Sequence, residues 1–435
     1  MRIREVGVRA ACCLGAALTV AALAGTPAVA VPATDAPPSS GPSTTTTPPF
    51  TTPNTDDCPQ KTQPPAPVDT SEVPAPGDPT PSPLPVPSPA IGGQRMGDCG
   101  VVLPDGAPPV PAEISATSWM VSDLDTGRVL AAKDPHGRYR PASTIKVALA
   151  IVALRSLDLD EVVIGTQADA DVDGTRVGIG PGGRYTNRQL MQALIMCSGN
   201  DAAHAIATQL GGDKRAVAKM NEVAKTLRAM DTRAATPSGL DGPGMSTSAY
   251  DLSVLFREAM SIPLFAELIH TEQVDFPGFP ADPAIPGDKD HPGFPIANDN
   301  QLLYNYAGAI GGKTGFTDDA RQTFVAAAER DGHRLVVTLL KADVRPIRPW
   351  EQAARLLDYG FALDTDARIG KLPESGSEAV QPSVPLASPP PRADGSEVEQ
   401  DRPAHQGARI ATLIGGPVVV LGLLLWARRI YRRRR

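Results

Sequence analysis

Proline confines the folded part of this chain to its middle. Nineteen of the 46 prolines in the 435 residues fall between Pro32 and Pro89. Segments so rich in proline and hydroxyl residues have too few apolar side chains for a core, so we expect 31–112 to be extended and disordered. A second stretch of this kind covers 369–408. The remaining residues, 113–368, are enough for one large domain or two interleaved lobes.

The two ends of the chain carry membrane signals of different kinds. A basic start, an apolar run and the small residues Ala28-Val29-Ala30 predict a cleaved signal peptide over 1–30. An uncharged run that is about 26 Å long as a helix predicts a membrane-spanning helix over 409–427. Arginines crowd the tail 428–435. Positive residues stay on the cytoplasmic side, so we expect a single-pass cell-membrane protein with domain 113–368 outside the cytoplasm.

Charge and cysteine usage narrow the choice of partners. Without the predicted signal peptide and the arginine-rich tail, 32 basic and 47 acidic residues remain, and their net charge of −15 argues against nucleic acid as a partner. Cys12 and Cys13 leave with the signal peptide, whereas Cys58 and Cys99 enter an oxidising compartment. We expect these two to form a disulfide that ties the N-terminal segment to the body. Cys197 lies in an apolar helical run and is interpreted as a small buried hydrophobe. Histidines lack the spacing of an HExxH zinc site, so no metal is expected.

Strand patterns lie at both ends of the folded region, with helical patterns between them. The first two and last three strands are positioned to form one antiparallel sheet, with the helices packed against it as a separate mass. Strands are predicted over 117–122, 129–132, 311–317, 323–328 and 334–340, and helices over 143–154, 186–197, 201–210, 213–230 and 349–359.

Three short motifs follow one another in this region. They are Ser143-Thr144-Ile145-Lys146, Ser198-Gly199-Asn200 and Lys313-Thr314-Gly315. Each motif alone is weak, because such short patterns arise often by chance. All three in this order, each in a fitting local structure, are a strong signal for a serine acyl-transfer site.

Ser143 and Lys146 have the residue types and spacing that a serine nucleophile requires. A serine hydroxyl is a poor nucleophile until a neighbour takes its proton. Positions i and i+3 share a helix face, so Lys146 can reach Ser143. Lys146 must be neutral to act as a base, which burial at the positive start of an apolar helix favours. The alternative, an ordinary solvated lysine, fits poorly because the neighbouring residues are apolar.

The other two motifs place polar groups at a break between helices and on a strand. Ser198 and Asn200 separate two helical runs, where a turn can direct them at a cleft. Plain helix capping is the alternative, and both readings can hold together. Lys313 and Thr314 lie on a predicted strand among glycines that leave room for a substrate backbone. A phosphate-binding loop is set aside there, because Ala307 occupies the position that its pattern reserves for glycine.

At these motifs the chain resembles the low-molecular-mass penicillin-binding proteins. These are serine D-Ala-D-Ala carboxypeptidases and relatives of the class A β-lactamases. The resemblance covers 113–368 and includes the run 297–303 before the third motif and the segment 236–241. Thr236 stands where relatives usually carry Asn, and Arg321 where many carry a small residue. Both departures concern the detail of the cleft and leave the catalytic set intact.

The resemblance implies an α+β fold with a five-stranded antiparallel sheet flanked by helices, plus a helical lobe. The active site would lie at their junction. It implies removal of the terminal D-Ala from peptidoglycan stem peptides through an acyl-enzyme, with β-lactams as inhibitors and without a cofactor. Many relatives carry a C-terminal β-domain and an amphipathic anchor. Here the linker 369–408 and the spanning helix 409–427 replace them, with the catalytic domain on the cell-wall side.

The resemblance also assigns roles to individual residues. Ser143 is the nucleophile and supplies one backbone N–H to the oxyanion hole, Lys146 is the base, and Ser198 relays a proton. The substrate-binding residues contact the peptide amide, hold the terminal carboxylate and complete the oxyanion hole through a backbone N–H; they are, in chain order, Asn200, Lys313, Thr314, Gly315 and Phe316.

Three other functions remain open at this point. A β-lactamase shares the fold but needs a carboxylate that drives deacylation, and no Glu-x-x-x-Asn element follows Asn200. The Ser198-Gly199-Asn200 triplet, in place of Ser-Asp-Asn, also favours a carboxypeptidase. A DD-endopeptidase uses the same chemistry on cross-links. A non-catalytic β-lactam or peptidoglycan sensor has no need for both motif lysines.

Overall fold

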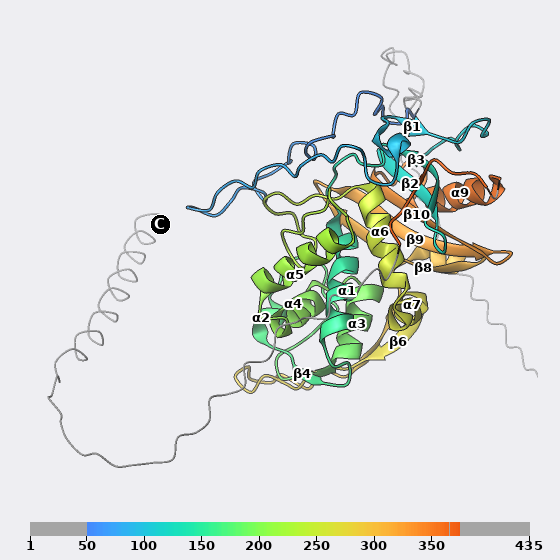
Figure 1. The fold of residues 1–435 in the computed structure, drawn as a ribbon. Helices are drawn as coiled ribbons and strands as arrows, with labels where there is room; N and C mark the ends of the chain where they lie inside the picture. Colours follow the sequence, from blue (N-terminus) through green and yellow to red (C-terminus); the bar gives the residue numbers. More distant parts are fainter. Residues whose placement is uncertain (1–49, 365, 375–435) are drawn as a thin grey trace, which may run out of the picture. The chain divides into compact units, whose positions relative to one another are not determined.

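A computed structural model describes residues 50–364 and 366–374 of the chain (Figure 1). The predicted signal peptide over 1–30, the spanning helix over 409–427 and the tail lie outside these residues, as does most of the linker. Within the described ranges, none of the helices has the length and apolar character needed to cross a membrane.

One antiparallel sheet organises the described residues, with strands in the order β1-β3-β2-β10-β9-β8 and β11 paired to β3. The five expected strands are present as its centre. The expected sheet of five strands is corrected to seven. The two additional strands are the short strands β1 and β11, which come from the segments before and after the predicted domain core and both pair with β3. The strands are β1 (Val101–Val102), β2 (Ser118–Asp123), β3 (Arg128–Lys133), β8 (Ala309–Thr317), β9 (Arg321–Arg330), β10 (His333–Ala342) and β11 (Gly370–Lys371).

Helices cover both faces of this sheet (Figure 1). One apolar cluster joins the sheet to α1 and α6, and a second joins the other face to α8 and α9. Strand β2 is buried along its whole length because both faces are covered. The helices are α1 (Lys146–Ser156), α2 (Gln167–Ala170), α3 (Asn187–Met196), α4 (Asn200–Gln209), α5 (Asp213–Thr226), α6 (Ala249–Met260), α7 (Pro263–His270), α8 (Gln301–Asn305) and α9 (Pro349–Ala362).

Local capping sets several of these boundaries. Thr186 caps the start of α3 with a capping box. Its side chain accepts a hydrogen bond from the Gln189 backbone N–H, and the Gln189 side chain accepts one from the Thr186 backbone N–H. Helix α5 ends at Thr226, before the expected residue 230, and Arg228 then adopts φ 61°. Two small antiparallel sheets of two strands each lie among the helices; their strands are β4 (Val162–Ile164) with β5 (Arg184–Thr186), and β6 (Gln273–Phe276) with β7 (Phe294–Ala297).

The helix expected over 143–154 starts later than predicted. Ser143 lies in a 3₁₀ turn, η2 (Ala142–Ile145), and α1 begins at Lys146. Ala142 has φ 48°, a conformation that a regular helix does not contain. The Pro141 carbonyl accepts a hydrogen bond from the Thr323 hydroxyl at 2.8 Å, which ties this turn to β9.

Residues 50–105, here called the arm, depart from the expected disorder over 31–112, of which residues 31–49 lie outside the described part of the chain. They have little regular structure, yet they pack on the body along a defined path (Figure 1). The buried Arg138 guanidinium donates to the carbonyls of Thr62, Leu84 and Pro85 at 2.7, 2.5 and 2.7 Å. Proline lowers the entropy that such a segment loses on docking, and its free carbonyls suit a buried guanidinium.

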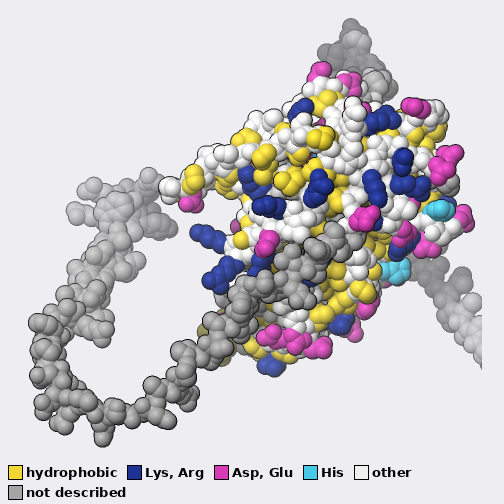
Figure 2. Space-filling model, in the orientation of Figure 1, with side chains coloured by type: hydrophobic (Ala, Val, Ile, Leu, Met, Phe, Trp, Pro, Cys, Tyr) yellow, Lys and Arg dark blue, Asp and Glu magenta, His cyan; other side chains and the backbone are white. Residues whose placement is uncertain are grey.

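The disulfide between Cys58 and Cys99 closes a loop within the arm. Their Cα atoms are 5.1 Å apart. Cys99 lies two residues before β1, which pairs with β3 of the main sheet, so the bond ties the start of the arm to the body as expected. In Figure 2 much of the arm is yellow and white, since its exposed residues include proline and the valines Val68, Val73 and Val86.

Candidate active site

Lys146 lies at the centre of a buried polar cluster around the nucleophile. Its Nζ is 2.8 Å from Ser143 Oγ and 2.7 Å from Asn200 Oδ1, and it also contacts the Ser238 carbonyl. Burial, aided by the nearby Lys313 charge, lowers the pKa of Lys146 well below its usual value. A neutral amine has two N–H groups and one lone pair. Asn200 Oδ1 and the Ser238 carbonyl can only accept, so the lone pair is left to face the Ser143 hydroxyl.

Asn200 and Ser198 come from the break before α4. Asn200 is the first residue of the helix, and its Nδ2 donates to the Asp173 carbonyl at 2.7 Å. Both ends of its amide are therefore engaged inside the protein. Ser198 is 7% exposed and has φ 59°, an uncommon conformation that is frequent at functional sites. Among the described residues, its hydroxyl has no hydrogen bond to Ser143 or Lys146.

Strand β8 brings the third motif beside the nucleophile. Lys313 is 1% exposed, its Nζ donates to the Thr314 carbonyl at 2.8 Å, and burial lowers its pKa. The Thr314 hydroxyl donates to Asp299 at 2.9 Å. A Cβ on Gly315 would lie 2.8 Å from the Ser143 nitrogen, so glycine is what lets the strand pass there. Phe316, whose backbone N–H is the second predicted oxyanion donor, is the residue next to this close contact between Gly315 and Ser143.

The segment 236–241 forms the opposite border of the cluster. Gly239 has φ 87°, and a Cβ there would lie 2.1 Å from the Ala142 carbonyl oxygen. The Thr236 hydroxyl donates to the Leu240 carbonyl at 2.8 Å and accepts from the Gly239 N–H at 3.1 Å. Threonine thus bridges the turn in which relatives usually carry Asn. The sequence could not predict the contact between the Ser238 carbonyl and Lys146, because every residue type has a backbone carbonyl.

A hollow of about 520 Å³ lies beside Thr314 and Asp299. Arg345 and Arg348, from the loop between β10 and α9, line it. Sequence reasoning missed these two arginines because no motif surrounds them. Arg321, the second departure from the family pattern, has its guanidinium 5.9 Å from the centre of the Phe316 ring and pairs with Asp343.

Cys197, expected to be a small buried hydrophobe, is partly buried and packs against the apolar core. Its thiol donates to the Ala297 carbonyl at 3.3 Å. Burial raises the pKa of the thiol to about 11. The thiolate is therefore disfavoured at neutral pH, and Cys197 is a poor nucleophile.

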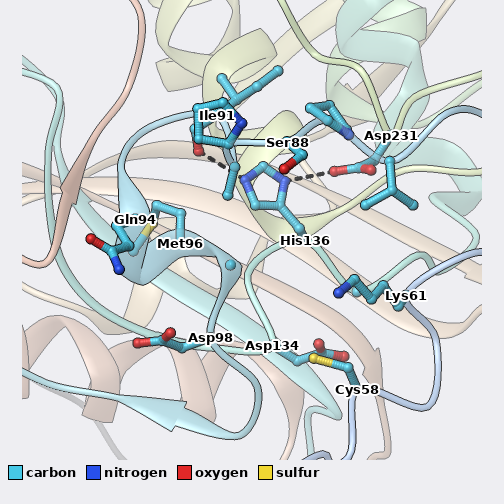
Figure 3. Close-up of a pocket in the computed structure, with 16 residues that line it drawn as sticks. Cys58, Lys61, Ser88, Ile91, Gln94, Met96, Asp98, Asp134, His136 and Asp231 are labelled. Atoms are coloured by element: carbon cyan, nitrogen blue, oxygen red, sulfur yellow. Dashed lines mark hydrogen bonds and ion pairs between the residues drawn. The ribbon is translucent and has the colours of Figure 1, made fainter.

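A second hollow, of about 320 Å³, lies between the arm and the body and is lined by none of the motif residues (Figure 3). His136 lies at its centre. One ring nitrogen, Nδ1, is 2.7 Å from Asp231 Oδ2, and the other, Nε2, is 3.0 Å from the Ile91 carbonyl. Both partners are acceptors, so the geometry fits a doubly protonated imidazolium.

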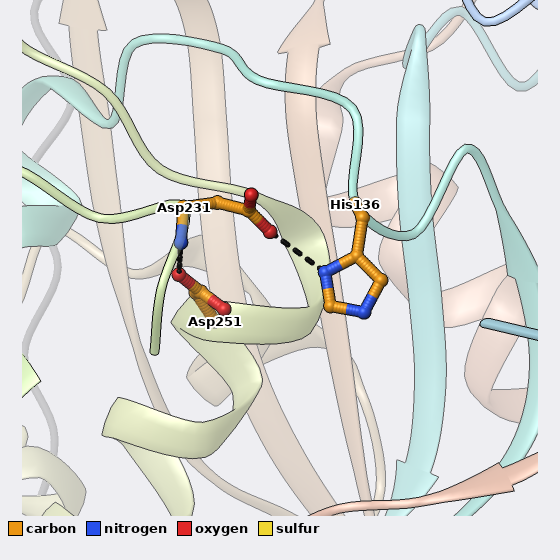
Figure 4. A group of neighbouring side chains, drawn as sticks. All are labelled: His136, Asp231 and Asp251. Carbon is orange, nitrogen blue, oxygen red and sulfur yellow. Dashed lines mark hydrogen bonds and ion pairs between the residues drawn. The ribbon is translucent and has the colours of Figure 1, made fainter. Parts of the chain in front are cut away.

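Two groups in the described residues have spacings that a metal ion can use. His136, Asp231 and Asp251 form one of them (Figure 4). The other contains Glu72 and two further aspartates. A guanidinium already supplies positive charge in each, since Arg138 donates to Asp231 and an arginine pairs with Glu72. Neither group includes a residue of the three motifs.

Comparison with known proteins assigns the family. The sequence model of the Peptidase_S11 family, D-alanyl-D-alanine carboxypeptidase, matches residues 106–344. The chain is 47% identical over 275 residues to D-alanyl-D-alanine carboxypeptidase DacB2 of Mycobacterium tuberculosis, covering 62% of this chain and 90% of that protein. Against DacD of Escherichia coli, identity is 34% over 274 residues, covering 60% and 67%.

A solved structure supports the same assignment. The crystal structure of a D-alanyl-D-alanine carboxypeptidase from Mycobacterium tuberculosis is similar with a TM-score of 0.57 and 46% identity, covering 62% of this chain and all of that one. Sequence and fold thus agree over the region that carries the three motifs. The chain belongs to the D-alanyl-D-alanine carboxypeptidase family of serine peptidases.

Proposed function

We propose that this chain is a serine-type D-Ala-D-Ala carboxypeptidase that removes the terminal D-Ala from peptidoglycan stem peptides and is acylated by β-lactams. Family membership supports the reaction class. The observation that carries the assignment of residues is the contact between Lys146 Nζ and Ser143 Oγ at 2.8 Å, with the lysine pKa lowered.

The proposed reaction has two stages. The Ser143 oxygen attacks the carbonyl of the penultimate D-Ala while Lys146 takes the hydroxyl proton. The carbonyl oxygen becomes an oxyanion facing the backbone N–H groups of Ser143 and Phe316. When the C–N bond breaks, the proton passes to the amine of the leaving D-Ala, with Ser198 as relay. Water then hydrolyses the ester, which frees the shortened peptide and Ser143.

Substrate binding follows the same arrangement. Lys313 and Thr314 hold the free carboxylate of the terminal D-Ala, and Asn200 contacts the peptide amide. Asn200 is bonded to Lys146 and Asp173 in the structure. Its amide therefore has to exchange or share a partner when substrate arrives. A penicillin opens on Ser143 in the same way, but its leaving group stays attached.

The test is the release of D-Ala from a peptide that ends in D-Ala-D-Ala. The wild-type chain should release it, and Ser143→Ala should not. Labelled penicillin followed by peptide mapping should place the adduct on Ser143. Retained labelling in Ser143→Ala would remove Ser143 from the role of nucleophile.

We also propose that the chain is a single-pass membrane protein with its catalytic domain on the cell-wall side. The basic start, the cleavage pattern, the apolar run within 409–427 and the arginine-rich tail support this location. Protease added to intact spheroplasts should remove the catalytic domain and spare the tail. Protection of the catalytic domain would argue for the opposite orientation.

A further inference from the structure

We propose that Glu72, in the arm, is a positioning residue of the active site. It acts by holding Arg140, and Arg140 holds the turn that presents Ser143. The catalytic part of this inference rests on the function proposed above. Glu72 lies outside residues 106–344, which the family model matches, so the family pattern assigns it no role.

Glu72 and Arg140 form a buried two-pronged ion pair. Arg140 Nη2 donates to Glu72 Oε2 at 2.8 Å, and Arg140 Nε donates to Glu72 Oε1. The side chains are 2% exposed for Arg140 and 15% exposed for Glu72. Two parallel bonds fix the plane of a guanidinium as well as its position. The arm therefore determines where the Arg140 side chain lies.

Arg140 directly precedes the turn that carries the nucleophile. Pro141 and Ala142 are all that separate it from Ser143. Ala142 is held at φ 48°, and such a conformation persists only where its surroundings hold it in place. Thr323 holds the turn through the Pro141 carbonyl, and the Arg140 side chain holds it from the preceding residue.

Two further carboxylates compete for the same guanidinium. Asp319 Oδ2 lies 4.0 Å from Arg140 Nε, and carboxylate oxygens of Asp241, Asp319 and Glu72 lie within 4.8 Å of one another. Within the described residues, Asp319 Oδ2 and one oxygen of Asp241 are buried without a hydrogen-bond partner. Loss of the Glu72 charge therefore leaves Arg140 free to move toward these two unsatisfied carboxylate oxygens.

These two acids lie at the borders of the catalytic cluster. Asp241 ends the segment whose Ser238 carbonyl contacts Lys146, and Asp319 follows strand β8. Asp319 also accepts from the Val68 backbone of the arm. A shift of Arg140 toward them would displace the turn relative to Lys146. Small displacements of reacting groups cost large factors in rate.

The test uses Glu72→Gln, Glu72→Asp and, as matched control, Glu113→Gln in the intact chain. Glu113 also pairs with an arginine, Arg355, but both are exposed. Labelled penicillin gives the acylation rate constant and the saturation constant separately. Glu72→Gln should lower the rate constant by about ten- to a hundredfold with little change in saturation. Glu72→Asp, which keeps the charge, should recover part of that loss, and Glu113→Gln should match wild type.

A second measurement does not require activity. Amide hydrogen exchange over residues 140–146 should be faster in Glu72→Gln than in wild type or Glu113→Gln. An unchanged acylation rate constant in Glu72→Gln overturns the proposal. If the wild-type chain neither releases D-Ala nor binds penicillin, the proposed function fails instead. Hydrogen exchange then decides alone: unchanged exchange over 140–146 overturns the positioning role, and faster exchange supports it.

Discussion

The backbone of Gly315 passes so close to Ser143 that a Cβ at position 315 would lie 2.8 Å from the Ser143 nitrogen. The same Cβ would lie 2.4 Å from the Thr323 hydroxyl, which holds the turn. No side chain fits there without moving the strand or the nucleophile. The third motif therefore needs its glycine for space at the nucleophile.

Gly315→Ala should reduce acylation by penicillin on the order of a hundredfold, because the turn and strand β8 must separate. The measurement is the acylation rate constant, with circular dichroism to show that the variant is folded. A folded variant acylated at the wild-type rate would mean that the cleft relaxes without cost.

Lys146→Ala should nearly abolish acylation at every substrate concentration, because Ser143 loses the group that takes its proton. In the wild type, the acylation rate should rise with pH as Lys146 becomes neutral. It should reach a plateau well below about 10.4, the usual pKa of lysine, because burial and the Lys313 charge lower the value. A rise that continues to the usual lysine pKa would contradict the neutral base.

Lys313→Ala should impair substrates with a free terminal carboxylate much more than matched amides. Part of the loss should appear in kcat, because binding energy is also used in the transition state. The measurement is kcat/KM for acid and amide forms of one D-Ala-D-Ala peptide. Equal losses for the two forms would show that Lys313 does not recognise the carboxylate.

The group around His136 should make stability fall as pH rises (Figure 4). Asp231 bonds His136, Arg138 bonds Asp231, and Asp251 completes the group. Although burial acts against it, Asp231 raises the pKa of His136. The charged His136 therefore stabilises the folded state fully below about pH 6.5, its pKa in the unfolded chain. This stabilisation is lost as pH rises through the higher pKa of His136 in the folded protein.

Asp251 acts in the same direction. Burial, with the Asp231 charge, raises its pKa to about 8. In the unfolded chain Asp251 ionises at about pH 4, whereas in the folded protein it stays protonated to a higher pH. The folded state therefore loses stability as pH rises above about 4. The melting temperature should fall between pH 6 and 9, and His136→Gln should flatten that fall. An unchanged slope in His136→Gln would show that this imidazole is not charged in the folded protein.

Removing the disulfide should destabilise the docked arm. A loop closed between Cys58 and Cys99, 41 positions apart, contributes about 2–4 kcal/mol by restricting the unfolded chain. The Cys58→Ser/Cys99→Ser variant should lose about that much free energy of unfolding in a urea titration. Non-reducing peptide mapping of the wild type should find the two cysteines joined. Two free thiols would contradict the bond.

Local sequence predicted the elements whose signals are local. The five central strands, the capped start at Thr186 and the pairing of Ser143 with Lys146 three positions later all follow from neighbouring residues. The disulfide between Cys58 and Cys99 was predicted and is present, whereas the short strand β1 that follows Cys99 was not predicted. The predictions for the chain ends lie outside the described residues.

The sequence by itself determined the five central strands, five of the helices, the motif order and the class of chemistry, because hydrophobic period, caps and motifs act over short distances. Only the tertiary structure decided that the arm docks, that the Ser238 carbonyl contacts Lys146 and that Glu72 holds Arg140. The arm has few apolar residues, so composition predicted disorder. It is held instead by bonds from buried cations of the body to its carbonyls and to Glu72, and such partners meet only after the chain has folded.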